Sequence, residues 1–189
     1  GVDYCEKSFQ SAVAIDEVEI AAPNAQQLCN SYAIKGNYRE LAQVARQAIA
    51  MIESKHREAD YFGTILNIYS GLCGHCGHAL GMMGHFEEGI SLCEKGLIQA
   101  QREANLYGIA MNEFNYGFLF IHKGDGEKAR HYLEKSILIF EKTQILLLLG
   151  LTMTGLGRAY NLLGELRLAQ DCIERGLKFQ EEAGLKAFS

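Results

Sequence analysis

The sequence has few residues that interrupt a helix. Its 189 residues include one proline and no tryptophan. Proline breaks the interior of helices and of central strands, so a chain that almost lacks it favours long regular elements. Apolar residues recur at helical spacing along the chain, and no stretch alternates as a half-buried strand does. These patterns predict an all-α fold.

Features that attract nucleic acid or a membrane are also missing from the sequence. The 18 Lys and Arg residues are scattered among 23 Asp and Glu, and no basic block of the kind that binds nucleic acid is present. The longest apolar run, Ile145–Leu151, is too short to span a bilayer. The first eleven residues have the pattern of a charged amphipathic helix rather than of a signal peptide. We therefore expect no nucleic-acid partner and no membrane partner.

The six cysteines have the register of buried residues rather than of a disulfide framework. Cys5 and Cys93 occupy the same place in two Cys-Glu-Lys segments, and Cys29, Cys73 and Cys76 fall on the apolar stripes of predicted helices. A free cysteine behaves as a small buried apolar residue. Reduced thiols are typical of the cytoplasm, which is the localisation we expect.

Glycine marks the repeat. Gly36, Gly84, Gly124 and Gly164 each follow an apolar helical stretch and precede a second amphipathic one, at spacings of 48, 40 and 40 residues. Glycine commonly ends a helix in the left-handed conformation because it lacks a Cβ. A fixed period of 20–50 residues is typical of stacked helical hairpins. The spacing therefore predicts a solenoid of antiparallel helix pairs.

About nine helices fit this pattern. They are expected at 1–15, 22–35, 38–56, 61–83, 86–102, 106–123, 126–142, 145–163 and 166–183. We interpret the chain as a single solenoid domain over 1–189, part of a longer protein. Its expected units are a half repeat at 1–19 and repeats at 20–59, 60–103, 104–143 and 144–184.

Local residues place the helix ends and the contacts between helices. Pro23 suits the first turn of a helix, where its missing N–H costs nothing. Five residues are expected at N-cap positions: Asn37, Asp60, Asn105, Asp125 and Thr143. Small residues at matching positions allow the two helices of a hairpin to approach closely: Cys29, Gly77, Gly117 and Gly157 on first helices, and Gly89, Ala129 and Ala169 on second helices, where Leu41 departs from the pattern.

The last repeat resembles the tetratricopeptide repeat. The resemblance lies in Leu156, Gly157, Tyr160, Gly164, Leu166 and Ala169, followed by Gly176. Weaker copies run over 28–48, 76–96 and 116–136. The usual period of that family is 34 residues, and the longer period here is similar to that of repeats in multidomain signalling regulators and cell-polarity adaptors. The resemblance implies a right-handed superhelix whose first helices line a concave groove, which binds peptides, helices or domains without catalysis.

Candidate binding residues are those that the resemblance places in this groove. They are Asn30, His78, Phe114, Phe118, Arg158 and Asn161. Some family members hold a peptide carboxylate with groove lysines, but the matching positions here carry amides, His and Phe. The polar residues are expected to orient a partner and the two phenylalanines to supply most of the affinity. Whether Phe114 and Phe118 belong to the groove or to the core stays open.

Two stretches have compositions that also occur in metal and phosphate sites. Cys73, Cys76 and the nearby histidines contain a Cys-x-x-Cys half-site, but His75 leaves the face that the cysteines share. The glycines of 71–84 lack the preceding strand and the Gly-Lys-Ser/Thr of a phosphate loop, so we interpret them as a packing face. We expect no metal, no cofactor and no enzymatic activity.

Two functions are compatible with these features. The first is a protein-protein interaction scaffold that binds a peptide, helix or partner domain in its groove. The alternative is a ligand-sensing regulatory arm of a multidomain signalling ATPase, nucleotide cyclase or transcriptional regulator, with a small molecule near His75, His78 and Gly81. A homodimer through the end helices or through Ile145–Leu151 is a further expectation, because exposed apolar patches on a soluble protein indicate an interface.

Overall fold

The computed structural model describes residues 2–64 and 66–184, and most of them are helical. This part holds nine α-helices and no strand. They are α1 (Val2–Ala14), α2 (Val18–Lys35), α3 (Tyr38–Ser54), α4 (Ile68–Met82), α5 (Phe86–Arg102), α6 (Leu106–Lys123), α7 (Gly126–Thr143), α8 (Leu146–Leu162) and α9 (Leu166–Glu182). None of these helices is long and apolar enough to cross a membrane.

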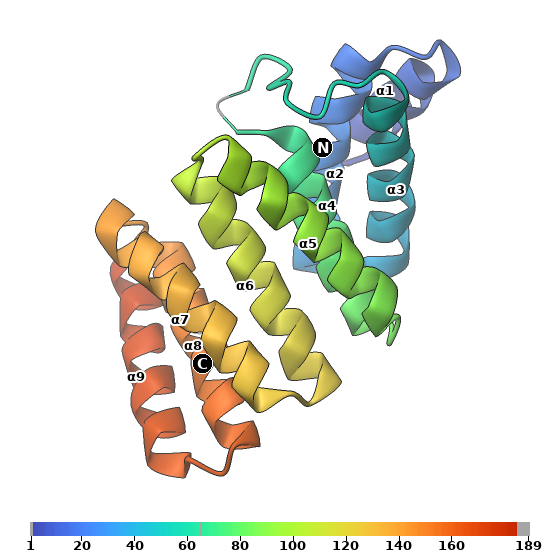
Figure 1. The fold of residues 1–189 in the computed structure, drawn as a ribbon. Coiled ribbons are helices and arrows are strands. Elements are labelled where there is room, and N and C mark those ends of the chain that lie inside the picture. The colour runs from blue at the N-terminus through green and yellow to red at the C-terminus, as the bar shows by residue number, and fades with distance from the viewer. Residues whose placement is uncertain (1, 65, 185–189) are drawn as a thin grey trace.

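Four hairpins stack side by side after α1 (Figure 1). They are α2–α3, α4–α5, α6–α7 and α8–α9. The first helices of successive hairpins pack closely, α2 with α4, α4 with α6 and α6 with α8, whereas the backbones of consecutive second helices lie farther apart within the described residues. The stack therefore curves with its first helices on the inner side. The predicted all-α solenoid of antiparallel helix pairs is confirmed.

The turn glycines adopt the conformation that their sequence context predicts. Gly36, Gly84, Gly124 and Gly164 have φ angles of +75°, +84°, +80° and +77°. In each turn a backbone N–H of the glycine or of the next residue donates back to a carbonyl in the last turn of the helix. A side chain at these positions would be strained, because L-residues with a Cβ rarely adopt this region.

The start of α2 differs from the prediction. The helix begins at Val18 rather than at residue 22, so Pro23 is its sixth residue and lies beyond the first turn. Val18, Ala21 and Ala22 are all buried. Burial of these apolar side chains against the core extends the helix past the point that the proline alone suggested, which is a tertiary effect on a local preference.

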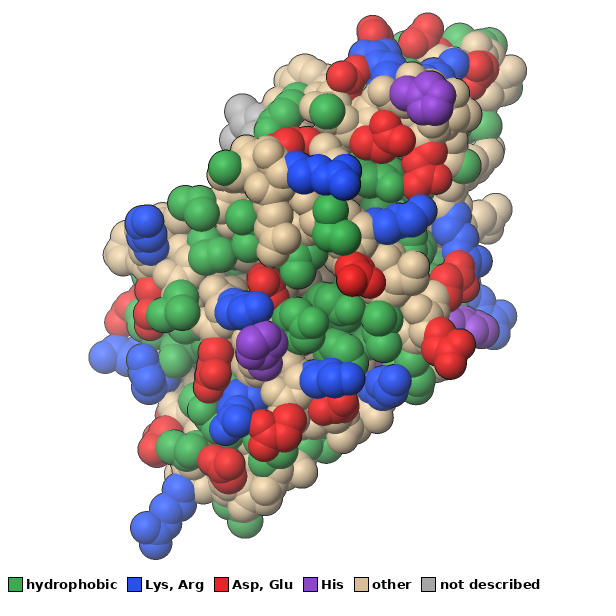
Figure 2. All heavy atoms as spheres, in the orientation of Figure 1, with side chains coloured by type: hydrophobic (Ala, Val, Ile, Leu, Met, Phe, Trp, Pro, Cys, Tyr) green, Lys and Arg blue, Asp and Glu red, His purple; other side chains and the backbone are tan. Residues whose placement is uncertain are grey.

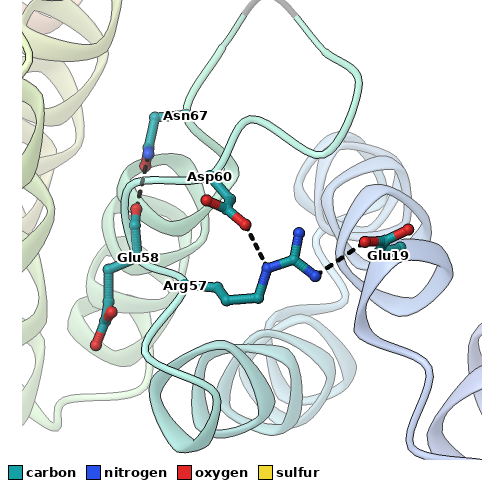
Figure 3. Close-up of polar contacts among 5 residues, drawn as sticks. All are labelled: Glu19, Arg57, Glu58, Asp60 and Asn67. Atoms are coloured by element: carbon teal, nitrogen blue, oxygen red, sulfur yellow. Dashed lines mark hydrogen bonds and ion pairs between the residues drawn. The ribbon is translucent and has the colours of Figure 1, made fainter.

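The start of α4 differs more. The helix begins at Ile68 rather than at residue 61, and the eight extra residues of the first glycine spacing belong to a loop between α3 and α4. Asn67, not Asp60, caps α4, since its Oδ1 accepts a hydrogen bond from the backbone N–H of Ser70 at 2.7 Å. Asp60 instead accepts from Arg57 inside the loop (Figure 3). The predicted cap at Asp60 is therefore wrong.

The other predicted caps have mixed outcomes. Asn105 and Asp125 accept hydrogen bonds from the backbone N–H groups of Gly108 and Lys128. Asn37 stands at the N-cap of α3 but its side chain makes no cap hydrogen bond. Thr143 is wrong as a cap, because it is the last residue of α7 and its hydroxyl donates back to the carbonyl of Ile139 at 2.9 Å.

Glycines bring the helices of the last three hairpins together. A Cβ built on Gly157 would stand 2.8 Å from the carbonyl oxygen of Ala169. A Cβ on Gly117 would stand 2.7 Å from Leu133 Cδ2. Real Cβ atoms do not approach other atoms this closely, so the small residues at these positions decide the distance between the helices.

Candidate functional site

The inner surface of the first three hairpins contains a cavity of about 250 Å³. Its walls come from α2, α4 and α6, and the end of the α3–α4 loop forms one side through Thr64, Leu66 and Asn67. None of the fifteen described residues that line it is Asp, Glu, Lys or Arg. His75, which also lines it, is neutral at physiological pH because burial lowers its pKa to about 4. The cavity is thus uncharged, although charged residues make up 22% of the chain.

Side-chain amides from two helices surround this cavity. On α2, the Nε2 of Gln26 donates to Asn30 Oδ1 at 3.3 Å, and Gln26 Oε1 is buried without a hydrogen-bond partner. On α6, Asn115 is 3% exposed and also lines the cavity. Buried amides are nearly always hydrogen-bonded, so the Gln26 carboxamide has unused capacity.

Asn112 fixes the floor of the cavity. Its Nδ2 donates to Ser70 Oγ and to the carbonyl of Gly108, both at 2.9 Å, and Ser70 Oγ donates on to the carbonyl of Gly96 at 2.9 Å. Both amide hydrogens are used, so the orientation of this carboxamide is determined by its neighbours. The chain of bonds joins α6, α4 and α5, which makes the floor a rigid part of the fold.

The α3–α4 loop is held in place beside the cavity by polar contacts (Figure 3). Arg57 donates to Asp60 within the loop and, at 3.0 Å, to Glu19 Oε1 on α2. Asn67 Nδ2 donates to the carbonyl of Glu58 at 2.8 Å. The same amide donates to Glu103 Oε1, at the end of α5, at 2.8 Å. The insertion in the 48-residue spacing therefore supplies a wall that the other repeats lack.

Further along the inner surface lies an aromatic cluster, which we define as Tyr38, His78, Phe114, Phe118 and His122. The His78 ring lies 5.8 Å from Phe118 and 6.0 Å from His122, measured between centroids. Phe114 and Phe118 are 4.6 Å apart. Burial, followed by repulsion from His122, lowers the pKa of His78 to about 3, and its Nε2 has no hydrogen-bond partner.

Glycine on α8 makes room for this cluster. A Cβ built on Gly155 would stand 2.7 Å from Phe118 Cε2, so Phe118 inserts against the α8 backbone. The guanidinium carbon of Arg158 lies 5.8 Å from the centre of the Phe118 ring, within the range of a cation–π contact. Phe114 and Phe118 are both half-buried. Each therefore contributes to packing and retains accessible ring surface.

The structure gathers four of the six predicted binding residues and separates the other two. His78, Phe114, Phe118 and Arg158 lie together in and beside the aromatic cluster. Asn30 is exposed at the cavity between α2 and α4 instead. Asn161 is exposed on α8, three residues after Arg158, and contributes to neither group. Whether these residues bind a partner stays a prediction.

Sequence reasoning missed Tyr107 and Asn112 as residues of the inner surface. Asn112 is 1% exposed and lies in α6 beside Glu113 and three residues before Asn115. Three polar residues close together in a largely apolar helix were the available signal, because buried polar groups require nearby hydrogen-bonding partners. The cavity itself could not be predicted, since it depends on where the inserted loop folds.

The cysteines have the character of core residues. All six are free, and Cys5 alone is half-buried while the other five are buried. Burial raises the pKa of the Cys76 thiol to about 12 and raises the pKa of Cys29, Cys73 and Cys93 further. Protonated thiols are poor nucleophiles and poor metal ligands. The described residues contain no group of three or more His, Cys, Asp or Glu that could hold a metal ion.

The outer side of the stack differs from the inner surface. Figure 2 shows acidic and basic side chains mixed across the face on which α5 and α7 lie in front. Exposed ion pairs join α3 to α5, Arg46 with Glu88 at 2.6 Å and Lys95 with Glu53 at 3.1 Å. Such pairs contribute little to stability. This is the composition of an ordinary solvated face.

Apolar residues are also exposed near the C-terminal end of the stack. Leu166, Ile173 and Leu177 of α9 are 65%, 37% and 42% exposed. The run Ile145–Leu151 is divided between surface and core, with Leu147 at 39% and Leu149 at 3%. The helix therefore anchors part of this run inside α8–α9 and leaves part of it accessible.

Comparisons with known proteins agree with this architecture. Residues 106–182 match the family model described as tetratricopeptide repeat. No curated protein matches the chain. Among solved structures, the chain is similar to the nearly identical TPR-like repeats of a putative kinesin light chain from Podosopora anserina. A variant of those repeats has a TM-score of 0.63 at 15% identity, over 97% of this chain and 94% of that one.

Two further structures give the same result. The unsubstituted Podosopora anserina repeats have a TM-score of 0.60 at 15% identity, over 98% of this chain and 95% of that one. BtubC (BKLC) from P. vanneervenii has a TM-score of 0.52 at 12% identity, over 100% and 92%. At these identities the likeness concerns the fold. Residues 106–182 therefore match the tetratricopeptide repeat, and the described chain as a whole has the fold of a TPR-like solenoid.

Proposed function

We propose that this chain binds a peptide, a helix or a partner domain on the surface formed by α2, α4, α6 and α8. A TPR-like solenoid supports a role as a protein-interaction scaffold in general. The observation that carries the specific proposal is the aromatic cluster, where Phe114 packs 4.6 Å from Phe118 and both rings are half-buried. Aromatic side chains that keep accessible surface beside an arginine are typical of the residues that dominate binding energy.

Phe114 and Arg158 have the most direct roles in this proposal. Phe114 offers ring surface to an apolar side chain of the partner, whereas Arg158 is exposed and free to pair with a backbone carbonyl or a carboxylate. Phe118 inserts against Gly155 and holds both in position. His78 is neutral at physiological pH, so it contributes shape and ring surface rather than charge.

A peptide-display selection tests this proposal. A random peptide library is selected on the wild-type chain, and the recovered peptides are titrated against Phe114→Ala and Arg158→Glu. We expect each substitution to weaken binding by a factor of ten or more, because removal of a central aromatic or charged contact costs about 2 kcal/mol or more. Leu138→Ala on α7, where Leu138 is 66% exposed, is the matched control and should leave binding unchanged.

The outcome against the proposal is equally definite. Peptides that bind wild type and both variants alike use another surface, and recovery of no peptide at all also counts against the inner surface as a peptide site. Phe118 is left intact in this test because its packing against Gly155 would mix a loss of stability with a loss of binding.

Self-association through the end of the stack is a second part of the proposal. Three exposed apolar residues of α9 are spaced so that they lie along one side of the helix: Leu166, Ile173 and Leu177. Their exposure supports a homodimer through α9. Sedimentation velocity of the wild type and of the double variant Leu166→Glu/Leu177→Glu tests this homodimer. We expect a dimeric wild type and a monomeric variant. A wild type that stays monomeric at high concentration would contradict the proposal.

The uncharged cavity supports a second candidate function, a ligand-sensing arm of a multidomain cytoplasmic signalling regulator. The cavity touches α2, α4 and α6, which belong to three successive hairpins. A molecule bound there would favour one relative arrangement of these hairpins over others. Hydrogen exchange of α2 and α6 with and without such a molecule would detect this change, and unaltered exchange at saturation would contradict it.

A further inference from the structure

We propose that the cavity between α2, α4 and α6 binds a small, uncharged, flat molecule with an amide-like edge, the chemistry of a nucleobase or a nucleoside. Any regulatory effect of such binding rests on the second candidate function, whereas the binding is a property of this chain alone. The argument for it combines the charge, the hydrogen-bonding capacity and the size of the cavity.

Charge excludes most common metabolites from this cavity. Its described lining contains no Lys or Arg to pair with a phosphate or a carboxylate, and no Asp or Glu to pair with an amine. Burial of an ion without a partner costs several kcal/mol. Nucleotides, free amino acids and organic acids are therefore disfavoured, and neutral molecules are favoured.

The hydrogen-bonding groups that line the cavity favour a polar ligand over an apolar one. Asn115 is 3% exposed and lines the cavity. A carboxamide offers one acceptor and one donor side by side, and the edge of a nucleobase offers the complementary pair. A ligand with such an edge would therefore pair with both groups of the Asn115 carboxamide.

Gln26 supplies an unpartnered polar atom to the same cavity. Its Oε1 is buried without a partner, and exchange of its oxygen and nitrogen would leave a buried NH2 without a partner instead. The unsatisfied group is therefore a property of the site and not of the assignment of the amide. Gln26 lies on α2 and Asn115 on α6, so a ligand between them meets polar groups from both sides.

The size and the remaining walls indicate a single ring system. A cavity of about 250 Å³ lies below the usual range of about 300–1,000 Å³ for drug-sized ligands. Pro23, Ile68, Tyr107 and Met111 supply apolar surface. Flat aromatic molecules gain from contact with such walls, and tyrosine in particular stacks on base faces.

Gly71 keeps the cavity open. A Cβ built on Gly71 would stand 2.7 Å from Gln26 Oε1, the end of a flexible side chain. Gly71→Ala should therefore displace the Gln26 amide and disturb the site without clashing with backbone. Replacing glycine with alanine inside a helix also favours folding, so the variant is expected to stay folded.

Ligand-observed NMR and calorimetry with the 189-residue chain test the proposal. The probes are adenine, hypoxanthine, cytosine, uracil and their nucleosides, with adenosine 5′-monophosphate and benzene as charged and apolar comparisons. We expect at least one base or nucleoside to bind, with the monophosphate and benzene at least tenfold weaker. Asn115→Leu and Gly71→Ala should each reduce the affinity tenfold or more, and Asn161→Ala, outside the cavity, should not.

Three results would overturn the proposal. They are the absence of binding by every base and nucleoside at millimolar concentration, equal binding of benzene, and undiminished binding in both Asn115→Leu and Gly71→Ala. Thermal unfolding of each variant verifies that it is folded. Phe114→Ala should leave base binding intact, so failure of the peptide-binding proposal and failure of this one are separate outcomes.

Discussion

Gly77 and Gly89 face each other across the α4–α5 hairpin, each pressed against the backbone of the other. A Cβ built on Gly77 would stand 2.6 Å from the carbonyl oxygen of Gly89, and a Cβ on Gly89 would stand 2.7 Å from the carbonyl oxygen of Gly77. The obstacle on both sides is backbone, which cannot rotate away as a side chain can. The distance between these two helices is therefore set by the absence of two methyl groups.

We predict that Gly77→Ala destabilises the chain. The added methyl group overpacks the contact with Gly89 and Cys93, at a cost of about 1–3 kcal/mol, which exceeds the gain in helix propensity of about 0.5–1 kcal/mol. Urea unfolding followed by circular dichroism measures the difference. Gly71→Ala on the same helix is the control, because its new methyl group meets only a flexible side chain, and equal stability of the two variants would contradict the packing explanation.

Asn67→Ala should weaken the junction between α3 and α4. The substitution removes the cap of α4 and the hydrogen bonds to the Glu58 carbonyl and to Glu103. Caps contribute about 0.5–2 kcal/mol and a buried hydrogen bond about 1 kcal/mol, so we expect a loss of about 2 kcal/mol. The comparison is Asn37→Ala, at an N-cap without a side-chain hydrogen bond, and a similar loss in both variants would refute the role given to Asn67.

Glu113 should make the stability of the chain depend on pH in the range above 4.5, the ordinary pKa of its carboxyl group. Glu113 is 3% exposed, its Oε2 has no hydrogen-bond partner, and burial raises its pKa to about 7 despite Lys135 at 3.8 Å. The folded state then holds a proton that the unfolded state has lost, so the contribution of Glu113 to stability decreases as pH rises from about 4.5 to about 7.

Glu113→Gln removes this dependence, because glutamine is neutral at every pH. Unfolding by urea at pH 5 and pH 8 should show the variant gaining stability relative to wild type at the higher pH, by about 1–3 kcal/mol. A constant difference between the two proteins across this range would show that Glu113 ionises freely in the folded state.

His78 should act on stability in the opposite pH direction. Burial lowers its pKa to about 3 from an ordinary value of 6.5, so the unfolded state binds a proton that the folded state does not. Stability therefore falls as pH decreases from about 6.5 towards 3 and is unaffected above 7. His78→Phe keeps an aromatic ring beside Phe118 and removes both the titration and the unpartnered Nε2.

The measurement is thermal unfolding of wild type and His78→Phe at pH 5 and pH 7.5. We expect the variant to be more stable at both values, because an unpartnered buried polar atom costs about 1–3 kcal/mol, with the larger gain at pH 5. His122→Phe, a ring that is less deeply buried in the same cluster, is the control. A larger gain at pH 7.5 than at pH 5 would be inconsistent with a neutral buried His78.

Particular residues show how far the sequence could be interpreted. The four turn glycines and the 3.6-residue spacing of apolar residues predicted the hairpins, because local backbone conformation and helical periodicity are properties of short segments. The same reasoning was wrong at Asp60 and Thr143, where several polar residues near a helix end compete for one cap. Tertiary contacts decided that competition, since Asn67 also reaches the Glu58 carbonyl and Glu103.

The inner surface was only partly predictable for a related reason. The resemblance placed His78, Phe114, Phe118 and Arg158 on first helices, and the helix packing brings them together. It also placed Asn30 on that surface, but its association with Gln26 in a separate cavity depends on the α3–α4 loop. Periodicity specifies which face of a helix a residue occupies, not which residues of other helices come to face it.

The sequence by itself determined that this chain forms stacked helix pairs, because glycine turns and apolar stripes act within about 40 residues. Only the tertiary structure decided that eight additional residues form a wall, that Gln26 Oε1 is buried without a partner, and that Phe118 rests on Gly155. These features arise between segments from different hairpins, and their geometry depends on how closely glycine lets the helices approach.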